Sequence, residues 1–186
     1  MEIRAFLDFL NIAEKLKCNT RHSYTSSGRH ESVAEHSWRL ALMAYLVKDE
    51  FPEVNIDRVI RMCLFHDMGE AVTGDIPAFE KTKQDEEVES TAVSRLLEQL
   101  PEPYYDEVGE LFAEMDAQQT IEAKLYKALD KLEALIQHNE AELSTWIPLE
   151  YDLQMTYGTK ECGFSEYINE LRNAVREDSR RKTGME

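Results

Sequence analysis

A histidine followed directly by an aspartate, His66-Asp67, ends a strongly apolar stretch that begins at Val59. Burying an imidazole and a carboxylate together is costly unless another group compensates them. A divalent cation would do so, because imidazole nitrogen and carboxylate oxygen are ordinary ligands for zinc, manganese, cobalt and iron. The dipeptide therefore predicts part of a metal site, whose other ligands must come from elsewhere in the chain.

Two further residues can supply those ligands. His36 lies just inside an expected helix, and Asp130 lies among apolar neighbours that point its carboxylate partly inward. Two imidazoles and two carboxylates would leave positions open for water and substrate, as a catalytic site requires, whereas structural zinc sites are closed by protein ligands. Taken singly, His36 is more often a capped or core histidine and Asp130 a satisfied buried acid. Spacing alone leaves their assignment open.

A second polar cluster follows the dipeptide. Glu70 is four residues after His66, so one more helical turn would place it on the same face. A carboxylate that lies beside a metal without binding it suits a general acid or base, although a surface carboxylate would show the same spacing. Asp75 either shapes a turn or accepts a hydrogen bond from a substrate hydroxyl. The candidate phosphate-binding cations are Arg21, Arg39 and Lys81.

The elements that must position these residues are expected to be helices, because no run alternates apolar and polar residues well enough for a sheet. Ser32 and Glu35 have the spacing of a capping box at a helix start. The expected helices cover residues 3–16, 32–51, 55–67, 85–100, 104–115, 120–143 and 164–180, with a loop containing Pro148 before the last. The sequence thus predicts an all-α fold: a single compact helical domain over residues 1–186, with the motifs within about 21–132 and further helices in 133–180.

Composition excludes several classes of protein. The formal charge of −16 argues against binding to a nucleic-acid polymer, which requires a basic surface. No apolar run approaches the length of a membrane span, and the N-terminus lacks the pattern of a secretion signal. The three cysteines are far apart and form no Cys-x-x-Cys pair. We therefore expect a cytoplasmic protein without disulfide bonds or thiolate zinc sites.

Three stretches, residues 21–36, 66–77 and 127–132, together resemble the HD-domain superfamily of metal-dependent phosphohydrolases. That superfamily is defined by a spaced histidine, a His-Asp dipeptide and a distant aspartate. The likeness is greatest to the bacterial 5′-deoxynucleotidase branch. A bare His-Asp is a weak motif, but His-Asp-x-x-Glu-x-x-x-Gly-Asp-x-Pro over residues 66–77 is specific.

The resemblance implies one divalent metal ion, which could be Mn, Co, Zn, Fe, Ni or Cu. It implies a metal-dependent phosphomonoesterase of the 5′-deoxynucleotidase kind, which acts on (deoxy)nucleoside 5′-monophosphates. Members of this family commonly pair as homodimers. Glu70 would handle the proton, Asp75 the sugar 3′-hydroxyl and Arg21 the phosphate. The implied metal ligands are His36, His66, Asp67 and Asp130. Together with the candidate cation Lys81 and with His22, which follows Arg21, the expected substrate contacts are Arg21, His22, Asp75 and Lys81.

One residue departs from the deoxynucleotidase pattern. Those enzymes place a tryptophan after the arginine that matches Arg21, where it helps recognise deoxyribose, whereas this chain has His22. The smaller, hydrogen-bonding imidazole is expected to relax discrimination against a 2′-hydroxyl. Two alternatives stay open: hydrolysis of another phosphoester (cyclic, triphosphate or hyperphosphorylated nucleotide), or a non-catalytic metal-binding regulatory protein. A di-iron site is disfavoured, since the other histidines, His22, His30 and His138, form no adjacent pair.

Overall fold

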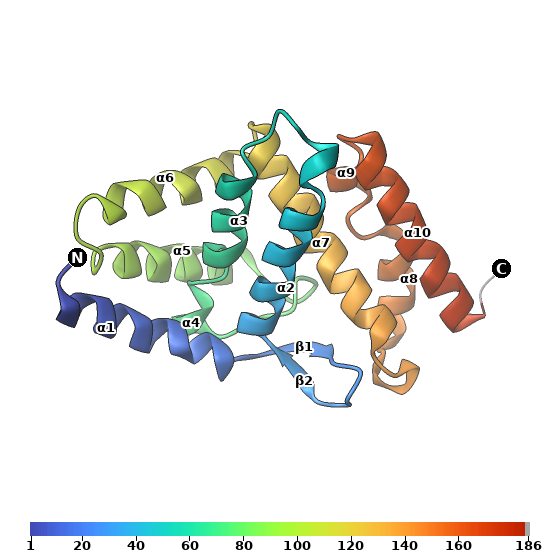
Figure 1. Cartoon of the computed structure of the whole chain (residues 1–186). Helices are drawn as coiled ribbons and strands as arrows, with labels where there is room; N and C mark the ends of the chain where they lie inside the picture. The colour runs from blue at the N-terminus through green and yellow to red at the C-terminus, as the bar shows by residue number, and fades with distance from the viewer. Residues whose placement is uncertain (185–186) are drawn as a thin grey trace.

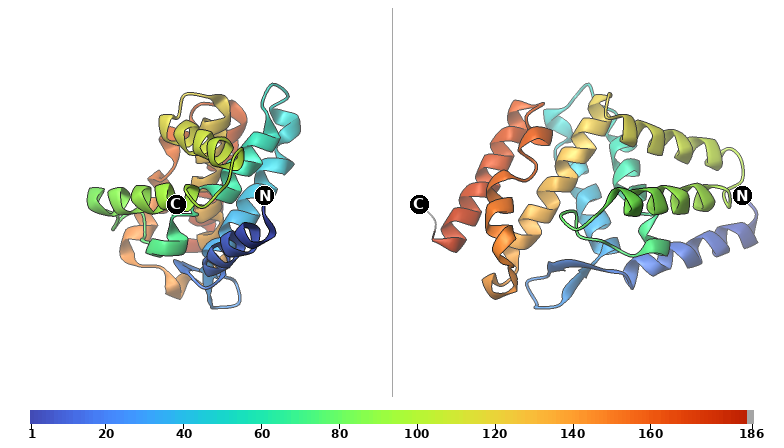
Figure 2. Two further views of the ribbon diagram at one scale, coloured as in Figure 1. Left: turned by 90° about the vertical axis from the view of Figure 1, so that its left-hand side faces the viewer. Right: turned by 180° about the vertical axis from the view of Figure 1, so that it is seen from behind.

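Helix α7 (Ile121–Glu140) lies at the centre of a bundle of helices, as Figures 1 and 2 show. In this computed structural model, which describes residues 1–184, α7 packs against α2 (Val33–Leu46), α3 (Ile56–Phe65), α6 (Tyr104–Ala117) and α10 (Glu166–Thr183). Helices α2 and α3 also pack against each other. The predicted all-α class is confirmed, and these contacts bring the helices of His36, His66 and Asp130 together.

The remaining elements surround this centre. Helices α1, α4, α5 and α6 lie on one side of α7, and α8, α9 and α10 lie on the other (Figure 1). The other helices are α1 (Ile3–Ala13), α4 (Glu70–Thr73), α5 (Lys83–Leu97), α8 (Pro148–Thr156) and α9 (Thr159–Cys162). Short 3₁₀ turns cover Glu14–Lys17, Lys48–Glu50 and Leu143–Thr145.

Local sequence explains where the central helices begin. The expected capping box is present at α2, where the Ser32 hydroxyl accepts from the Glu35 amide and the Glu35 carboxylate accepts from the Ser32 amide. These contacts satisfy backbone groups that a helix start leaves unpaired. Helix α3 is capped by the Asn55 side chain and α7 by the Thr120 hydroxyl. Helix α2 ends at Leu46, earlier than the sequence predicted.

The absence of a sheet was a wrong prediction. Strand β1 (Thr20–Tyr24) pairs antiparallel with β2 (His30–Ser32) in a two-stranded sheet. The residues of both strands are mostly polar, so hydrophobic periodicity could not reveal the sheet. The strands are joined by a turn in which Gly28 adopts a φ of 83° and the Thr25 amide donates to the Arg29 carbonyl. This hairpin leads directly into α2.

The expected loop around Pro148 was also wrong, because Pro148 is the first residue of α8. Proline suits a helix's first position, where its missing amide is not needed. Helix α8 brings Glu150 and Gln154 into the interior, where both are almost fully buried. The C-terminal third of the chain therefore contributes polar side chains to the inside of the molecule.

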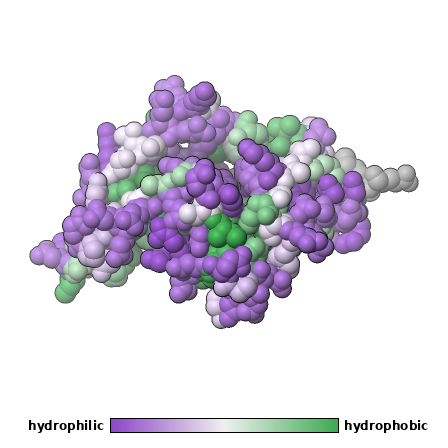
Figure 3. Space-filling view, turned by 90° about the horizontal axis from the view of Figure 1, so that it is seen from above, coloured by the Kyte–Doolittle hydropathy of each residue, from purple (hydrophilic) through white to green (hydrophobic). Residues whose placement is uncertain are grey.

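The surface agrees with the acidic composition. One face of the molecule is mostly hydrophilic, with a small apolar area near its middle (Figure 3). No helix in the described part of the chain is long and apolar enough to cross a membrane. Exposed apolar side chains do follow one face of α2: Trp38, Leu42, Tyr45 and Leu46.

The core contact that we expect to matter most for stability is made by Leu132, which is fully buried on α7. Leu132→Ala is expected to lower the free energy of unfolding by about 2–5 kcal/mol, because it leaves a cavity that the packed helices cannot close. Leu149→Ala, at a side chain that is 45% exposed on α8, serves as the control and should cost less than about 1 kcal/mol. Urea denaturation measures both, and equal losses would contradict the prediction.

Candidate metal centre

His36 lies in the first turn of α2 and is fully buried. Its Nδ1 atom hydrogen-bonds the carboxylate of Glu133, so the ring is fixed with Nε2 facing the other way. That Nε2 atom forms no hydrogen bond with any residue that the structure describes. A buried ring nitrogen without a partner is costly, and a bound cation is one way to satisfy it.

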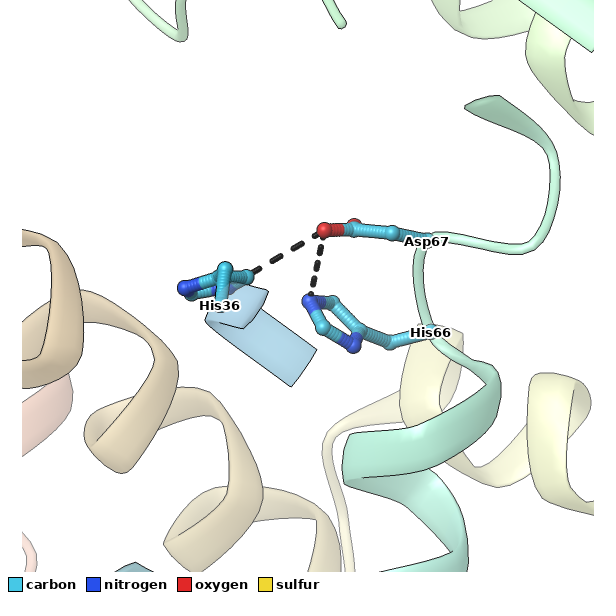
Figure 4. A group of neighbouring side chains, drawn as sticks. All are labelled: His36, His66 and Asp67. Carbon is cyan, nitrogen blue, oxygen red and sulfur yellow. Dashed lines mark ion pairs between the residues drawn. The ribbon is translucent and has the colours of Figure 1, made fainter. Parts of the chain in front are cut away.

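His66 and Asp67 come from the end of α3. The Nδ1 atom of His66 donates to the Cys63 carbonyl oxygen at 2.9 Å, which leaves its Nε2 also without a hydrogen-bond partner among the described residues. Asp67 Oδ2 lies 3.0 Å from His66 Nε2 and 3.9 Å from His36 Nε2 (Figure 4). Ligand atoms of His36, His66 and Asp67 thus lie within 4.8 Å of one another.

Asp130 reaches the same place from α7. Its Oδ1 atom lies 3.2 Å from His36 Nε2 and 3.9 Å from His66 Nε2. Its Oδ2 atom accepts from the Lys127 ammonium at 2.9 Å. Burial acts to raise the pKa of Asp130, but the charge of Lys127 and the nearby imidazole of His36 outweigh it and hold that pKa well below its usual range. The structure therefore brings all four expected ligands together.

The electrostatics of this group suit a cation. Burial and the charge of Arg21 act to lower the pKa of His36, but the Glu133 and Asp130 carboxylates outweigh them and raise it to about 9. Carboxylates that stabilise a proton at this place would stabilise a divalent ion there as well. Two unpartnered imidazole nitrogens flanked by carboxylate oxygens form a donor set that fits zinc or another first-row divalent ion.

Glu133 is the residue that orients His36, and it is fully buried. Its other oxygen accepts from Arg39 Nε at 2.6 Å, and Arg39 Nη1 reaches the exposed Glu140 at 2.5 Å. The two histidines therefore differ: a carboxylate holds His36, whereas a neutral carbonyl holds His66. A charged acceptor makes an imidazole a stronger donor of electrons to a metal than a neutral acceptor does.

Glu133→Gln is expected to weaken metal affinity by about 10- to 100-fold, the usual effect of losing an outer partner of a histidine ligand. Glu140→Gln is the matched control, because Glu140 contacts the same Arg39 but does not touch His36. Competition with a chromogenic chelator measures both dissociation constants. Equal constants for the two variants would show that Glu133 has no role in metal binding.

Glu70 begins α4 and points into the interior, since its side chain is buried and Oε2 has no hydrogen-bond partner within residues 1–184. Burial raises its pKa, and the negative charges of Asp67 and Asp75 raise it further, to about 10. In the metal-free protein the carboxyl is therefore protonated near neutral pH. A carboxylic acid kept neutral beside a cation site can exchange a proton with a substrate or water.

Comparison with known proteins decides the family. Residues 13–172 match the HD domain family. The chain belongs to the HD domain family. This HD domain is 37% identical over 147 residues to 5′-deoxynucleotidase HDDC2 of Homo sapiens, covering 75% of the chain and 69% of that protein. It is 32% identical over 146 residues to 5′-deoxynucleotidase hdd1 of Schizosaccharomyces pombe, covering 74% and 73%.

The fold of this HD domain is also similar to the folds of solved structures. It is similar to a protein described as a predicted metal-dependent phosphohydrolase from Magnetospirillum magnetotacticum, with a TM-score of 0.80 and 31% identity. That match covers 97% of this chain and 96% of the other. A conserved hypothetical protein from Pyrococcus furiosus matches with a TM-score of 0.67 and 28% identity, over 94% and 99% of the two chains.

Of the expected substrate-binding residues of this HD domain, some lie beside the expected metal ligands and others pair with residues elsewhere. Arg21 Nη1 lies 3.7 Å from Asp67 Oδ2, so its charge is next to the expected ligands, and burial raises the pKa of Asp75 despite the nearby charge of Arg21. Lys81 instead forms an ion pair with Glu89 of α5. His22 points its Nε2 at Glu150, 2.9 Å away.

Three buried carboxylates of this HD domain were not predicted from the sequence as part of the site: Glu31, Glu133 and Glu150. Glu31 accepts from Ser23 at 3.2 Å and lies 3.4 Å from Arg21 Nε. Glu133 could have been found, because it is three residues after Asp130 and so shares its helix face. Glu150 could not, since nothing near it in the sequence marks it as polar and buried.

Proposed function

We propose that this chain is a metal-dependent phosphohydrolase that releases phosphate from (deoxy)nucleoside 5′-monophosphates. The observation that carries the proposal is the pair of buried, unpartnered Nε2 atoms of His36 and His66, flanked by the carboxylates of Asp67 and Asp130. The names of the HDDC2 and hdd1 relatives support the nucleotide substrate. Membership of the HD domain family supports the dependence on a metal.

The roles of the residues follow from their charges. His36, His66, Asp67 and Asp130 would hold one divalent ion, which when bound polarises a phosphoryl oxygen and lowers the pKa of water. The Arg21 guanidinium would bind the equatorial phosphate oxygens, whose charge is redistributed in the transition state. Glu70 would transfer the proton, and Asp75 would accept a hydrogen bond from the sugar 3′-hydroxyl. Lys81 would add positive charge at longer range, since its ion pair with Glu89 occupies its ammonium.

A single ion is the simplest occupant. A second group of close acidic and imidazole ligand atoms exists, from Glu31, His36 and Glu133, but its carboxylates already pair with Arg21 and Arg39. Those arginines would repel a second cation. The nitrogen and oxygen donors do not select among Mn, Co, Zn, Fe, Ni and Cu, because metal availability often decides.

The test is phosphate release from metal-stripped protein resupplied with Mn, Co or Zn. The panel holds dNMPs, NMPs, dNTPs and a cyclic nucleotide. Release from monophosphates only with added metal supports the proposal. Release confined to the cyclic or triphosphate substrates, or no release from metal-loaded protein, would refute it and favour another phosphoester or a non-catalytic role.

We also infer a homodimer, with the chain acting as one domain in a reducing cytoplasm. The exposed apolar face of α2 (Trp38, Leu42, Tyr45 and Leu46) is the surface that a second copy would cover, because such a stripe is unusual on a monomer. The three cysteines are unpaired in the structure, as a reducing compartment requires. Light scattering of wild type and Trp38→Glu measures the mass, and a monomeric wild type would refute the dimer.

A further inference from the structure

Lys127 pairs with the expected ligand Asp130. The two residues are three apart on α7, so they lie on the same face of the helix. The Lys127 ammonium donates to Asp130 Oδ2 at 2.9 Å. Asp130 Oδ1 instead lies 3.2 Å from His36 Nε2 and 3.9 Å from His66 Nε2. The two oxygens of this carboxylate therefore have different neighbours, the lysine at one and the imidazole nitrogens at the other.

A tyrosine ring helps to fix the position of the Lys127 ammonium. Lys127 Nζ lies 5.6 Å from the centre of the Tyr126 ring, within the range of a cation–π contact. Tyr126 is 5% exposed, and its ring meets the His66 ring edge-on, with centroids 5.5 Å apart. The ammonium is thus held by a carboxylate and by a buried ring that packs against an expected ligand.

The other expected carboxylate ligand has no such arrangement. Arg21 Nη1 lies 3.7 Å from Asp67 Oδ2, which is longer than a hydrogen bond. That same Oδ2 atom is the one that lies 3.0 Å from His66 Nε2. Arg21 therefore approaches the oxygen that faces the histidine, whereas Lys127 hydrogen-bonds the second oxygen of its carboxylate. Of the two cations, only Lys127 separates the roles of the two oxygens.

This hydrogen bond limits what Asp130 can offer to a cation. A carboxylate can bind a metal ion through one oxygen or through both. A lysine ammonium only donates, and a hydrogen bond between two charged groups is about twice as strong as a neutral one. Asp130 Oδ2 is held by that bond, so Oδ1 is the oxygen left for an ion. A protein oxygen that is withheld leaves room for water and substrate, which a catalytic metal site requires.

We propose that Lys127 is a positioning residue that reserves Oδ2 of Asp130, so that this carboxylate offers a bound divalent ion one oxygen and leaves a position for water or a phosphate oxygen. The inference rests on the metal site of the proposed function and deepens it. It assigns to Lys127 the task of keeping the site open, in addition to the charge that it brings.

The test uses the full chain loaded with Mn(II) and Lys127→Met, which keeps a long side chain but neither donates nor carries a charge. The readout is the rate at which bound Mn(II) speeds the relaxation of water protons, because this rate rises with the number of waters on the ion. With Oδ2 released, the enhancement should fall by about the share of one bound water. The Mn(II) dissociation constant should not rise, since the carboxylate gains an oxygen and the site loses a positive charge.

A purely structural role for Lys127 predicts the opposite pattern. Loss of an outer partner that only holds a ligand in place usually weakens metal binding by about 10- to 100-fold. Such weakening in Lys127→Met, or an unchanged water signal, would overturn the inference. Lys127→Arg keeps a charged donor for Oδ2 and should retain the wild-type water signal, so a fall to the level of Lys127→Met would overturn it as well.

Lys124→Met is the matched control, because Lys124 is exposed one turn earlier on the same helix. It removes the same charge from α7 and should leave both the water signal and the Mn(II) dissociation constant at their wild-type values. The water measurement uses no nucleotide. Its outcome is therefore separate from the phosphate release that tests the proposed function.

Discussion

Asp67→Ala is expected to abolish metal binding and phosphate release together. The Asp67 carboxylate is the closest to His66 Nε2, at 3.0 Å, and it also faces His36 and Arg21. Without it, two imidazoles and a guanidinium would surround the ion with only Asp130 to offset its charge. The positive charge of Arg21 would then repel a divalent cation, and one carboxylate would be too little to offset that repulsion. Metal content after dialysis, measured by mass spectrometry, should fall from one ion per chain to none.

A stability measurement tests the same change without relying on activity. A ligand at about 100 times its dissociation constant stabilises a folded protein by about 2.7 kcal/mol. Added metal should therefore raise the Tm of the wild type by several degrees and leave the Tm of Asp67→Ala where it was. Asp57→Ala, at an exposed position in the first turn of α3, should behave like the wild type. An active Asp67→Ala protein without metal would refute the assignment of this ligand.

The expected ligands could be predicted because each lies where the sequence itself marks a helix. The capping box at Ser32 sets the start of α2, which places His36 in its first turn. The apolar run before His66 is the buried face of α3, and Asp130 follows the buried Leu129 on α7. Helical periodicity fixes such faces from local spacing alone.

The parts that were missed depend on tertiary contacts. The β1–β2 hairpin consists of polar residues, so its pairing arises from the turn at Gly28 and from Glu31 reaching toward Arg21. Glu150 and His22 are 128 residues apart, and no local pattern relates them. The position of Lys81 likewise depends on Glu89 of α5. Burial of a charged residue is decided by partners that arrive from other elements, which periodicity does not report.

Glu70→Gln is expected to retain the metal but lower kcat by about 10²- to 10⁴-fold, the usual contribution of a general acid or base. Glutamine fills the same buried space and cannot exchange a proton, so it isolates the proton transfer from packing. Glu70→Ala should lose as much turnover and still bind metal, because it leaves the expected ligands His36, His66, Asp67 and Asp130 in place. Steady-state phosphate release and metal content are measured on the same samples. Normal turnover in either variant would refute the acid/base role.

The metal-free protein offers a second measurement of the same carboxyl. Its pKa is raised from an ordinary value of 4.5 to about 10, first by burial and then by Asp67 and Asp75. Between those values the folded protein holds a proton that the unfolded chain has released, so folding stability falls as the pH rises through this range. Glu70→Gln removes this loss. We therefore expect the metal-free variant to be more stable than the metal-free wild type at about pH 8, with the difference vanishing near pH 4. Urea denaturation of both metal-free proteins at the two pH values measures this difference in the free energy of unfolding. A variant that is less stable than the wild type at about pH 8 would mean that Glu70 is ionised and paired there, and so acts as a base rather than an acid.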